Sequence, residues 1–344
     1  MLANFEKARQ AKSRLQFWKK EFDKIEEKRK RNSDNLTRQE WWEREYYETP
    51  YLTFARDSYL EERFFDHFHN IVRLTAEGQI APREDFAEPS GLIAPLFSHL
   101  KLEFSARGKG LPKVRDPIRD QLGKYFVNGT PTGVRLFRDL PETIGNVIVK
   151  FGKKNHLENM INKGAVRLTP ADFYNNGDLI EAMQDLETER WFHDPKFGHI
   201  ISGKSIINYQ GVDRQIEDGF LKYSISCPNY LLWSACKDID RRLPDDFQAD
   251  AAVIIKEPNK FINLISNKTR EIWPRAKIYN GDVKYYDPCS YVDAKRRPAT
   301  IKHFKFLYQR EWRFCAFPSV DDMPNEPMIV ELGSLGDIAE LVTL

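Results

Sequence analysis

The residue periodicity of the chain changes near Pro141, and this change constrains the fold more than any other feature. Before it, apolar residues recur three and four positions apart, as on the buried side of an amphipathic helix. After it, short runs alternate between apolar and polar residues, as along a strand with one buried face. We therefore expect an α+β protein, with a mostly helical N-terminal domain at residues 1–140 and a mixed domain at residues 141–344.

Three amphipathic helices are expected in the N-terminal domain, at residues 5–31, 37–47 and 57–72. In the first, Leu15, Trp18, Phe22 and Ile25 form one apolar stripe that requires a partner surface. Residues 1–31 hold 11 Lys or Arg against five Asp or Glu, and the helix ends in a run of basic residues. Such a run suits nucleic acid or an acidic protein partner.

The second domain is expected to alternate strands with a few helices. Strands are expected at residues 146–151, 165–170, 220–227 and 250–256. A helix ending at Gly164 separates the first two, and a further helical stretch is expected at residues 178–191. Asn280-Gly281, between alternating apolar residues, predicts a hairpin turn.

Composition indicates a soluble, cytoplasmic protein. The 344 residues are 41% hydrophobic and 30% charged, and we find neither a membrane-length apolar run nor a signal peptide. The four cysteines lie far apart, which favours structural thiols over a metal site.

The stretch LYQREWRFCAF, residues 307–317, places polar side chains where a buried strand is usually apolar. As a strand, its apolar face carries Tyr308, Trp312, Phe314 and Ala316. Its other face carries Gln309, Glu311, Arg313 and Cys315. The polar face either meets solvent at a sheet edge or lines a cleft. In the strand at 220–227, Ser224 and Ser226 also share one face, and we hypothesise that the two polar faces meet.

These segments resemble the mono-ADP-ribosyltransferases, a family that includes bacterial toxins and arginine-modifying enzymes. The resemblance rests on three ordered elements: Lys150 at the end of NVIVKF, Tyr223-Ser224-Ile225-Ser226, and Gln309-Arg310-Glu311. It implies a split β-sheet catalytic domain over about residues 141–344. Lys150 departs from the family, which usually has Arg, His or Tyr there; Arg167 or His156 could supply that contact instead.

The resemblance also implies roles for the matched residues, with NAD as the substrate and no metal. Glu311 would stabilise the oxocarbenium-like charge that develops when the nicotinamide–ribose bond breaks, and Gln309 would face the acceptor. Ser224 and Ser226 would support the cleft. Lys150 and Gly152 would contact the cofactor, and Phe151 and Tyr174 could provide an aromatic surface for nicotinamide.

By the same resemblance, the chain is expected to be a toxin of a toxin–antitoxin or phage-defence module. Its partners would be a nucleic-acid acceptor, RNA or DNA, an antitoxin protein and a chaperone, and no membrane. Several alternatives remain: a protein-modifying transferase, an NAD glycohydrolase, and a non-catalytic nucleic-acid-binding protein. A metal-dependent nuclease could instead use five residues of the third helix, Glu61, Glu62, Asp66, His67 and His69.

Overall fold

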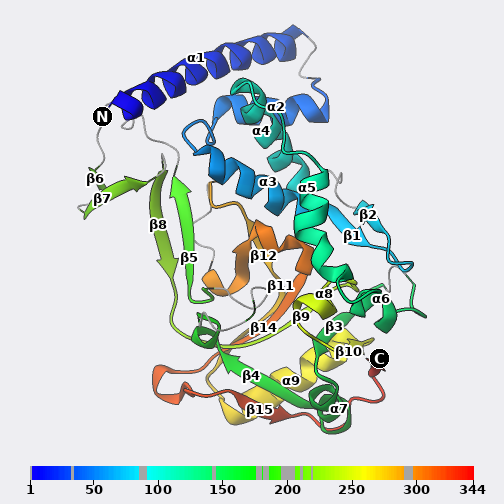
Figure 1. Ribbon diagram of the computed structural model, residues 1–344. Helices are drawn as coiled ribbons and strands as arrows, with labels where there is room; N and C mark the ends of the chain where they lie inside the picture. Colours follow the sequence, from blue (N-terminus) through cyan, green and yellow to red (C-terminus); the bar gives the residue numbers. More distant parts are fainter. Residues whose placement is uncertain are drawn as a thin grey trace.

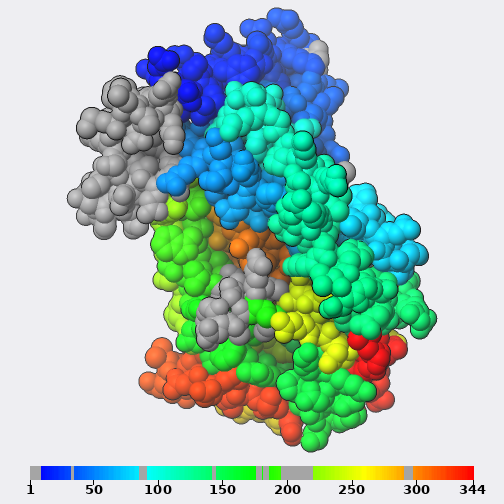
Figure 2. Space-filling view, viewed as in Figure 1, coloured from blue at the N-terminus to red at the C-terminus, as the bar shows by residue number. Residues whose placement is uncertain are grey.

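The computed structural model describes residues 2–31, 35–84, 91–141, 145–175, 180, 186–194, 206–209, 212–217, 220–289 and 297–344. Within these residues helices and strands both contribute, and the fold class is α+β as expected. The N-terminal helices form one end of the molecule, and strands of the C-terminal part lie toward the other end (Figure 1, Figure 2).

The α-helices are α1 (Leu2–Arg31), α2 (Arg38–Glu48), α3 (Asp57–Ile71), α4 (Ile93–Ala106), α5 (Arg115–Pro117), α6 (Thr132–Leu136), α7 (Lys154–Lys163), α8 (Leu243–Asp246) and α9 (Pro258–Ile272). Shorter or differently wound turns are η2 (Ile118–Leu122), η3 (Gly123–Phe126), η4 (Ala171–Asn175), η7 (Pro298–Thr300), η8 (Phe304–Gln309) and η9 (Val320–Asp322).

The strands are β1 (Val72–Leu74), β2 (Ile80–Pro82), β3 (Ile148–Gly152), β4 (Ala165–Pro170), β5 (Glu189–Asp194), β6 (Ile206–Tyr209), β7 (Val212–Glu217), β8 (Phe220–Ser226), β9 (Leu231–Cys236), β10 (Ala251–Ile255), β11 (Lys277–Asp282), β12 (Lys284–Tyr286), β13 (Ile301–His303), β14 (Glu311–Phe317), β15 (Met328–Glu331) and β16 (Ala339–Thr343).

The three N-terminal helices form where the sequence predicts them, because each has a strong local signal. Trp18, on the apolar stripe of α1, is buried against Tyr46 and Tyr47 of α2. Thr37 caps α2, accepting from the backbone N–H of Glu40 while the Glu40 carboxylate accepts from the N–H of Thr37. This reciprocal pair satisfies two backbone donors at the start of the helix.

The central sheet has the strand order β11-β14-β9-β3-β10-β16, with β4 and β15 attached beside β9. One face packs against α7 and α9 through a core that includes Met160, Trp233, Phe261 and Phe314. The opposite face packs against the segments around α6, α8 and η8. The sheet is therefore covered on both faces, and polar groups buried at it must find partners within the protein.

Buried ion pairs join the N-terminal region to the C-terminal part. Arg63 of α3 is almost fully buried and binds both carboxylate oxygens of Asp287. Arg83 donates to Asp240 at 3.0 Å. The two regions therefore share buried charged contacts, and Asp240 is also paired with Arg242 of its own region.

Three predictions of secondary structure, a turn, a helix and the start of a strand, need correction. Asn280-Gly281 is not a turn: β11 runs through both residues, which pair with Phe314 and Arg313 of β14. The helix predicted at residues 178–191 is wrong at its end, because β5 begins at Glu189; most of the rest lies outside the described residues. The strand predicted from Tyr308 begins only at Glu311, since residues up to Gln309 form a 3₁₀ turn.

Candidate functional site

The sheet forks beside β9, and this fork defines the candidate site. β9 pairs with β3 at one position, Cys236 with Val149, and with β4 at Leu232 and Leu231. Between these positions lies Ser234, whose carbonyl accepts a hydrogen bond from Nζ of Lys150 at 2.6 Å. The Lys150 ammonium also lies 5.3 Å from the centre of the Trp233 ring. Lys150 therefore occupies the point where β3 separates from β9.

Glu311 begins β14, on the other side of β9 from Lys150, and is 6% exposed. Its Oε1 accepts from Nε of Arg313 at 2.7 Å, and its Oε2 accepts from Nζ of Lys302 at 2.7 Å. Burial alone would raise the pKa of Glu311, but the charges and hydrogen bonds of Arg313 and Lys302 outweigh it and hold the pKa at about 2. The carboxylate is thus ionised at neutral pH.

Gln309 reaches the same site from the turn η8. Its Oε1 accepts from Nζ of Lys302 at 3.0 Å, so the one ammonium group bridges Gln309 and Glu311. The chain reverses between them at Arg310, whose φ of 42° lies in the left-handed region. The two residues therefore converge through a turn, not through the side-by-side spacing of a single strand.

A second buried carboxylate, Glu187, completes the network and was not recognised in the sequence. It accepts two parallel hydrogen bonds from Arg313, both 2.7 Å long, and one from Arg190 at 2.8 Å. Tyr230 also donates to it, at 3.2 Å. Its residue type and spacing carry no signal, because the contact joins segments 126 positions apart.

Among the described residues of this network, cations outnumber carboxylates. Two carboxylates, Glu187 and Glu311, face the three cations Arg190, Arg313 and Lys302. Lys150 adds a fourth, and burial lowers its pKa while Cys236 and Glu311 raise it. Among the described residues Lys150 has no carboxylate hydrogen-bonded to it. The site therefore favours an anionic ligand.

The aromatic candidates separate into two environments. Tyr174 lies near the network: burial raises the pKa of its hydroxyl, a hydrogen bond with Thr169 lowers it, and the charges of Glu187 and Glu311 raise it further. Phe151 instead belongs to the core on one face of the sheet, against Phe137. Tyr174 also packs against the buried cluster that contains Tyr230 and Leu232, so of the two aromatic candidates it is the one beside the network.

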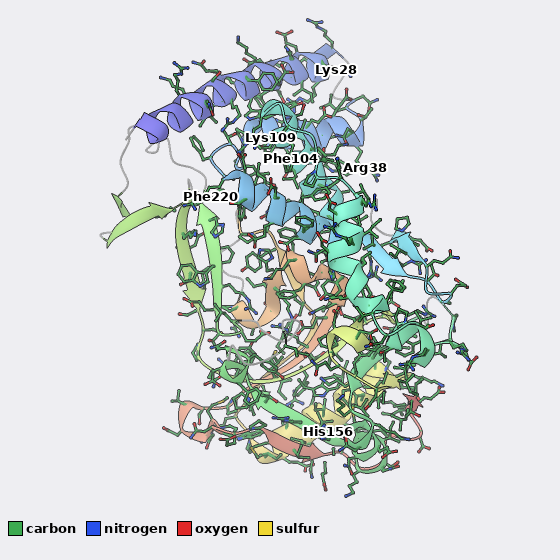
Figure 3. All side chains as sticks on the ribbon, in the orientation of Figure 1. Lys28, Arg38, Phe104, Lys109, His156 and Phe220 are labelled. Atoms are coloured by element: carbon green, nitrogen blue, oxygen red, sulfur yellow. The ribbon has the colours of Figure 1, made fainter. Side chains whose placement is uncertain are left out.

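The other residues proposed near Lys150, namely Gly152, His156 and Arg167, make no hydrogen bond or ion pair with the Glu311 network among the described residues. Gly152 ends β3 opposite Ala251. His156 is exposed on α7, at the end of the molecule opposite Lys28 (Figure 3). Arg167 is exposed on β4, with its guanidinium 5.6 Å from the centre of the Phe173 ring.

The structure does not bring Ser224 and Ser226 to Glu311. Both lie on β8, in the separate sheet β5-β8-β7-β6, opposite Trp191 and Glu189. Their strand neighbours Tyr223 and Ile225 pack inward against Phe192 and Ile301, and side chains alternate along a strand, so the serines face the other way. The serine on the strand next to Glu311 is Ser234, which follows Trp233 and pairs with Arg313.

The metal-site alternative is not assembled either. His67 is fully buried and stacks on Phe304, with ring centres 4.9 Å apart, while Glu61, Glu62, Asp66 and His69 line a different side of α3. In the described ranges, no group of three or more His, Cys, Asp or Glu side chains could hold a metal ion.

Comparison of the chain with models of protein families, with curated proteins and with solved structures finds no match. Within the part of the chain that the structure describes, no helix has both the length and the apolar character needed to cross a membrane.

Proposed function

We propose that this chain cleaves the bond between nicotinamide and ribose in NAD and transfers ADP-ribose to a macromolecule. The observation that carries the proposal is the ionised, buried carboxylate of Glu311 beside the fork of the sheet. When the C1′–N1 bond breaks, nicotinamide leaves with the bonding electrons and positive charge develops on the ribose. A fixed carboxylate in a site of low dielectric stabilises that charge.

The hydrogen bonds of Glu311 leave its carboxylate with spare capacity to accept a hydrogen bond from a substrate. Each carboxylate oxygen can accept more than one hydrogen bond, so a ribose hydroxyl can share Oε2 with Lys302. Gln309, held by the same ammonium group, would then face the acceptor. The acceptor nucleophile attacks C1′ and loses its proton to solvent.

The surplus of cations supports the choice of a dinucleotide. The diphosphate of NAD is anionic, and Lys150 is a partly buried ammonium group at the fork. Tyr174, also partly buried, is the aromatic candidate for nicotinamide.

The strand order supports the resemblance to ADP-ribosyltransferases in part. The strands bearing Lys150, Ser234 and Glu311 are neighbours in one forked sheet. In this proposal the second element of the resemblance moves from Tyr223-Ser224-Ile225-Ser226 to Trp233-Ser234-Ala235-Cys236.

The acceptor remains a prediction. The basic end of α1 is partly neutralised within the protein, because Lys28 pairs with Glu40 and Arg31 pairs with Glu27. These pairs reduce the charge available to a phosphate backbone. RNA, DNA and protein acceptors are therefore tested side by side, and the antitoxin and the chaperone remain predictions from resemblance.

The test is incubation with NAD labelled in the adenylate half, together with separate pools of RNA, DNA and cell protein. We expect label in one pool and equimolar nicotinamide, both abolished in Glu311→Gln, which keeps the side-chain shape. Glu331→Gln, at an exposed position of β15, is the matched control and should transfer label normally. Thermal unfolding verifies that both variants are folded.

Two results would separate the alternatives. Release of nicotinamide with no labelled acceptor, at a rate unchanged by any pool, indicates an NAD glycohydrolase. Unconsumed NAD in all three pools contradicts the proposal; RNA or DNA binding that persists in Glu311→Gln would then favour a non-catalytic binding protein.

A further inference from the structure

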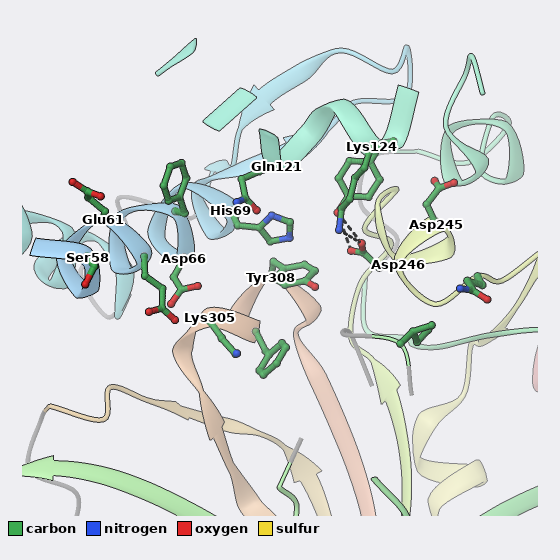
Figure 4. Close-up of a pocket in the computed structure, with 16 residues that line it drawn as sticks. Ser58, Glu61, Asp66, His69, Gln121, Lys124, Asp245, Asp246, Lys305 and Tyr308 are labelled. Atoms are coloured by element: carbon green, nitrogen blue, oxygen red, sulfur yellow. Dashed lines mark hydrogen bonds and ion pairs between the residues drawn. The ribbon is translucent and has the colours of Figure 1, made fainter. Parts of the chain in front are cut away.

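A cleft of about 780 Å³ lies between the N-terminal helices and the C-terminal part (Figure 4). It shares no residue with the Glu311 network, although the ring centre of Phe306, which lines it, lies 4.7 Å from the Lys302 ammonium. One wall is a single side of α3, and the opposite wall is formed by α8 and η3. The turn η8 contributes Lys305, Phe306 and Tyr308.

The cleft is acidic on two opposite walls. Glu61, Glu62 and Asp66 lie along α3, and Asp245 and Asp246 lie on α8. The cleft also contains two lysines: Lys124, which pairs with Asp246 at 2.9 Å, and Lys305, whose ammonium lies 4.9 Å from the Phe306 ring centre. Among the lining residues that the structure describes, carboxylates outnumber ammonium groups five to two, and this negative excess favours a cation.

Two buried acceptor atoms at the cleft have no hydrogen-bond partner among the described residues. They are Nδ1 of His69 and Oδ2 of Asp245. The His69 ring points into the cleft and packs edge-on against Tyr308, with ring centres 4.4 Å apart (Figure 4). Burial holds the pKa of His69 well below its ordinary value, and the charge of Arg242 lowers it further, so the ring is neutral and can accept a hydrogen bond.

The aromatic lining adds a surface for the apolar part of a ligand. Phe65, Tyr125, Phe306 and Tyr308 all line the cleft. Aromatic faces attract ammonium groups and pack against methylene chains. Unpartnered acceptors, facing carboxylates and aromatic walls together select a long, flexible cation rich in N–H donors.

We propose that this cleft binds an oligoamine, with ammonium groups at the two acidic walls and methylene segments over the aromatic lining. The same chemistry is available from a free polyamine and from neighbouring lysine side chains of a peptide. This inference is independent of NAD cleavage.

The test is calorimetric titration of the full-length protein with spermidine and, separately, with a short lysine-rich peptide. We expect one of them to bind at 1:1 stoichiometry, and the one that binds identifies the source of the amine. Glu61→Gln combined with Glu62→Gln, both at exposed positions of α3, should weaken binding about tenfold because it removes two of the facing charges.

The matched control removes the same net charge elsewhere, through Asp282→Asn combined with Asp337→Asn, both exposed and outside the cleft. It should bind as the unaltered protein does, and thermal unfolding verifies that both double variants are folded. Equal weakening in the two variants, equal competition by magnesium, or no binding of either amine ligand at low salt would overturn the proposal.

Discussion

Nε of Arg313 donates to Oε1 of Glu311 at 2.7 Å, because the two residues lie two positions apart on the same face of β14. The rest of the guanidinium binds Glu187, so one buried cation pairs with two carboxylates from distant segments. Arg supplies this planar, multi-directional donor set, whereas Lys concentrates its charge at one point.

Arg313→Lys should therefore destabilise the protein by about 3 kcal/mol, because it leaves buried carboxylates without their full set of donors. The measurement is the free energy of unfolding from urea denaturation. Arg275→Lys, at an exposed position after α9, is the control and should change little. A loss below about 1 kcal/mol in Arg313→Lys, the size typical of exposed pairs, would contradict a stabilising role.

The acid sensitivity of the fold should depend on Glu311. Its pKa falls from an ordinary 4.5 to about 2 on folding, so it stabilises the folded state above pH 4.5. That contribution, about 3 kcal/mol, is lost as the pH falls from 4.5 toward 2. Urea unfolding from pH 7 to pH 3 should show a steeper loss in the unaltered protein than in Glu311→Gln. Parallel curves would show that the pKa of Glu311 is not depressed.

Asn70 should prove important for the turn that carries Gln309. Its Nδ2 donates to the carbonyls of Phe304 and Lys305, and its Oδ1 accepts from the backbone N–H of Tyr308 at 2.7 Å. Asn70→Ala leaves these buried groups unpaired and should cost about 2–3 kcal/mol of unfolding free energy.

Asn159→Ala is the control for Asn70→Ala, since Asn159 is exposed and its side chain donates to the carbonyl of Asn155 in its own helix. A change in Asn70→Ala as small as in this control would mean that α3 does not hold the turn.

The buried ion pairs between the N-terminal region and the C-terminal part predict that both regions unfold together. Calorimetry of the unaltered protein should therefore show one unfolding transition.

The helices and strands whose apolar spacing or end residues lie within one short segment were predicted well from the sequence. Trp18 and Ile25 share one side of α1, and Gly164 ends α7 in the left-handed conformation, as their spacing and residue types predict. Strand β14 likewise buries Trp312, Phe314 and Ala316 on one face.

Features that depend on pairing between distant segments could not be predicted. Asn280-Gly281 satisfies the rule for a turn, yet ladder bonds to β14 keep it extended. Lys302, Gln309 and Glu311 meet only because the chain reverses at Arg310. Ser224 satisfies a motif spacing, but which strand lies beside Glu311 is decided by the order of the sheet.

Gly164 offers a direct test of close backbone packing, and Gly108 is its matched control. Both glycines have a φ of 65°, but only Gly164 has backbone atoms packed close to the position of a Cβ. A Cβ at Gly164 would lie 2.2 Å from the carbonyl oxygen of Gly333, whereas a Cβ at Gly108 would meet nothing within 4 Å. Both Gly→Ala changes incur the left-handed backbone cost, about 1 kcal/mol. Only Gly164→Ala should add about 2 kcal/mol or more from the overlap. The N–H of Gly333 donates to the Lys163 carbonyl at 3.1 Å, which holds this segment against Gly164. Equal losses of unfolding free energy in the two variants, measured by urea denaturation, would show that the segment around Gly333 moves aside freely.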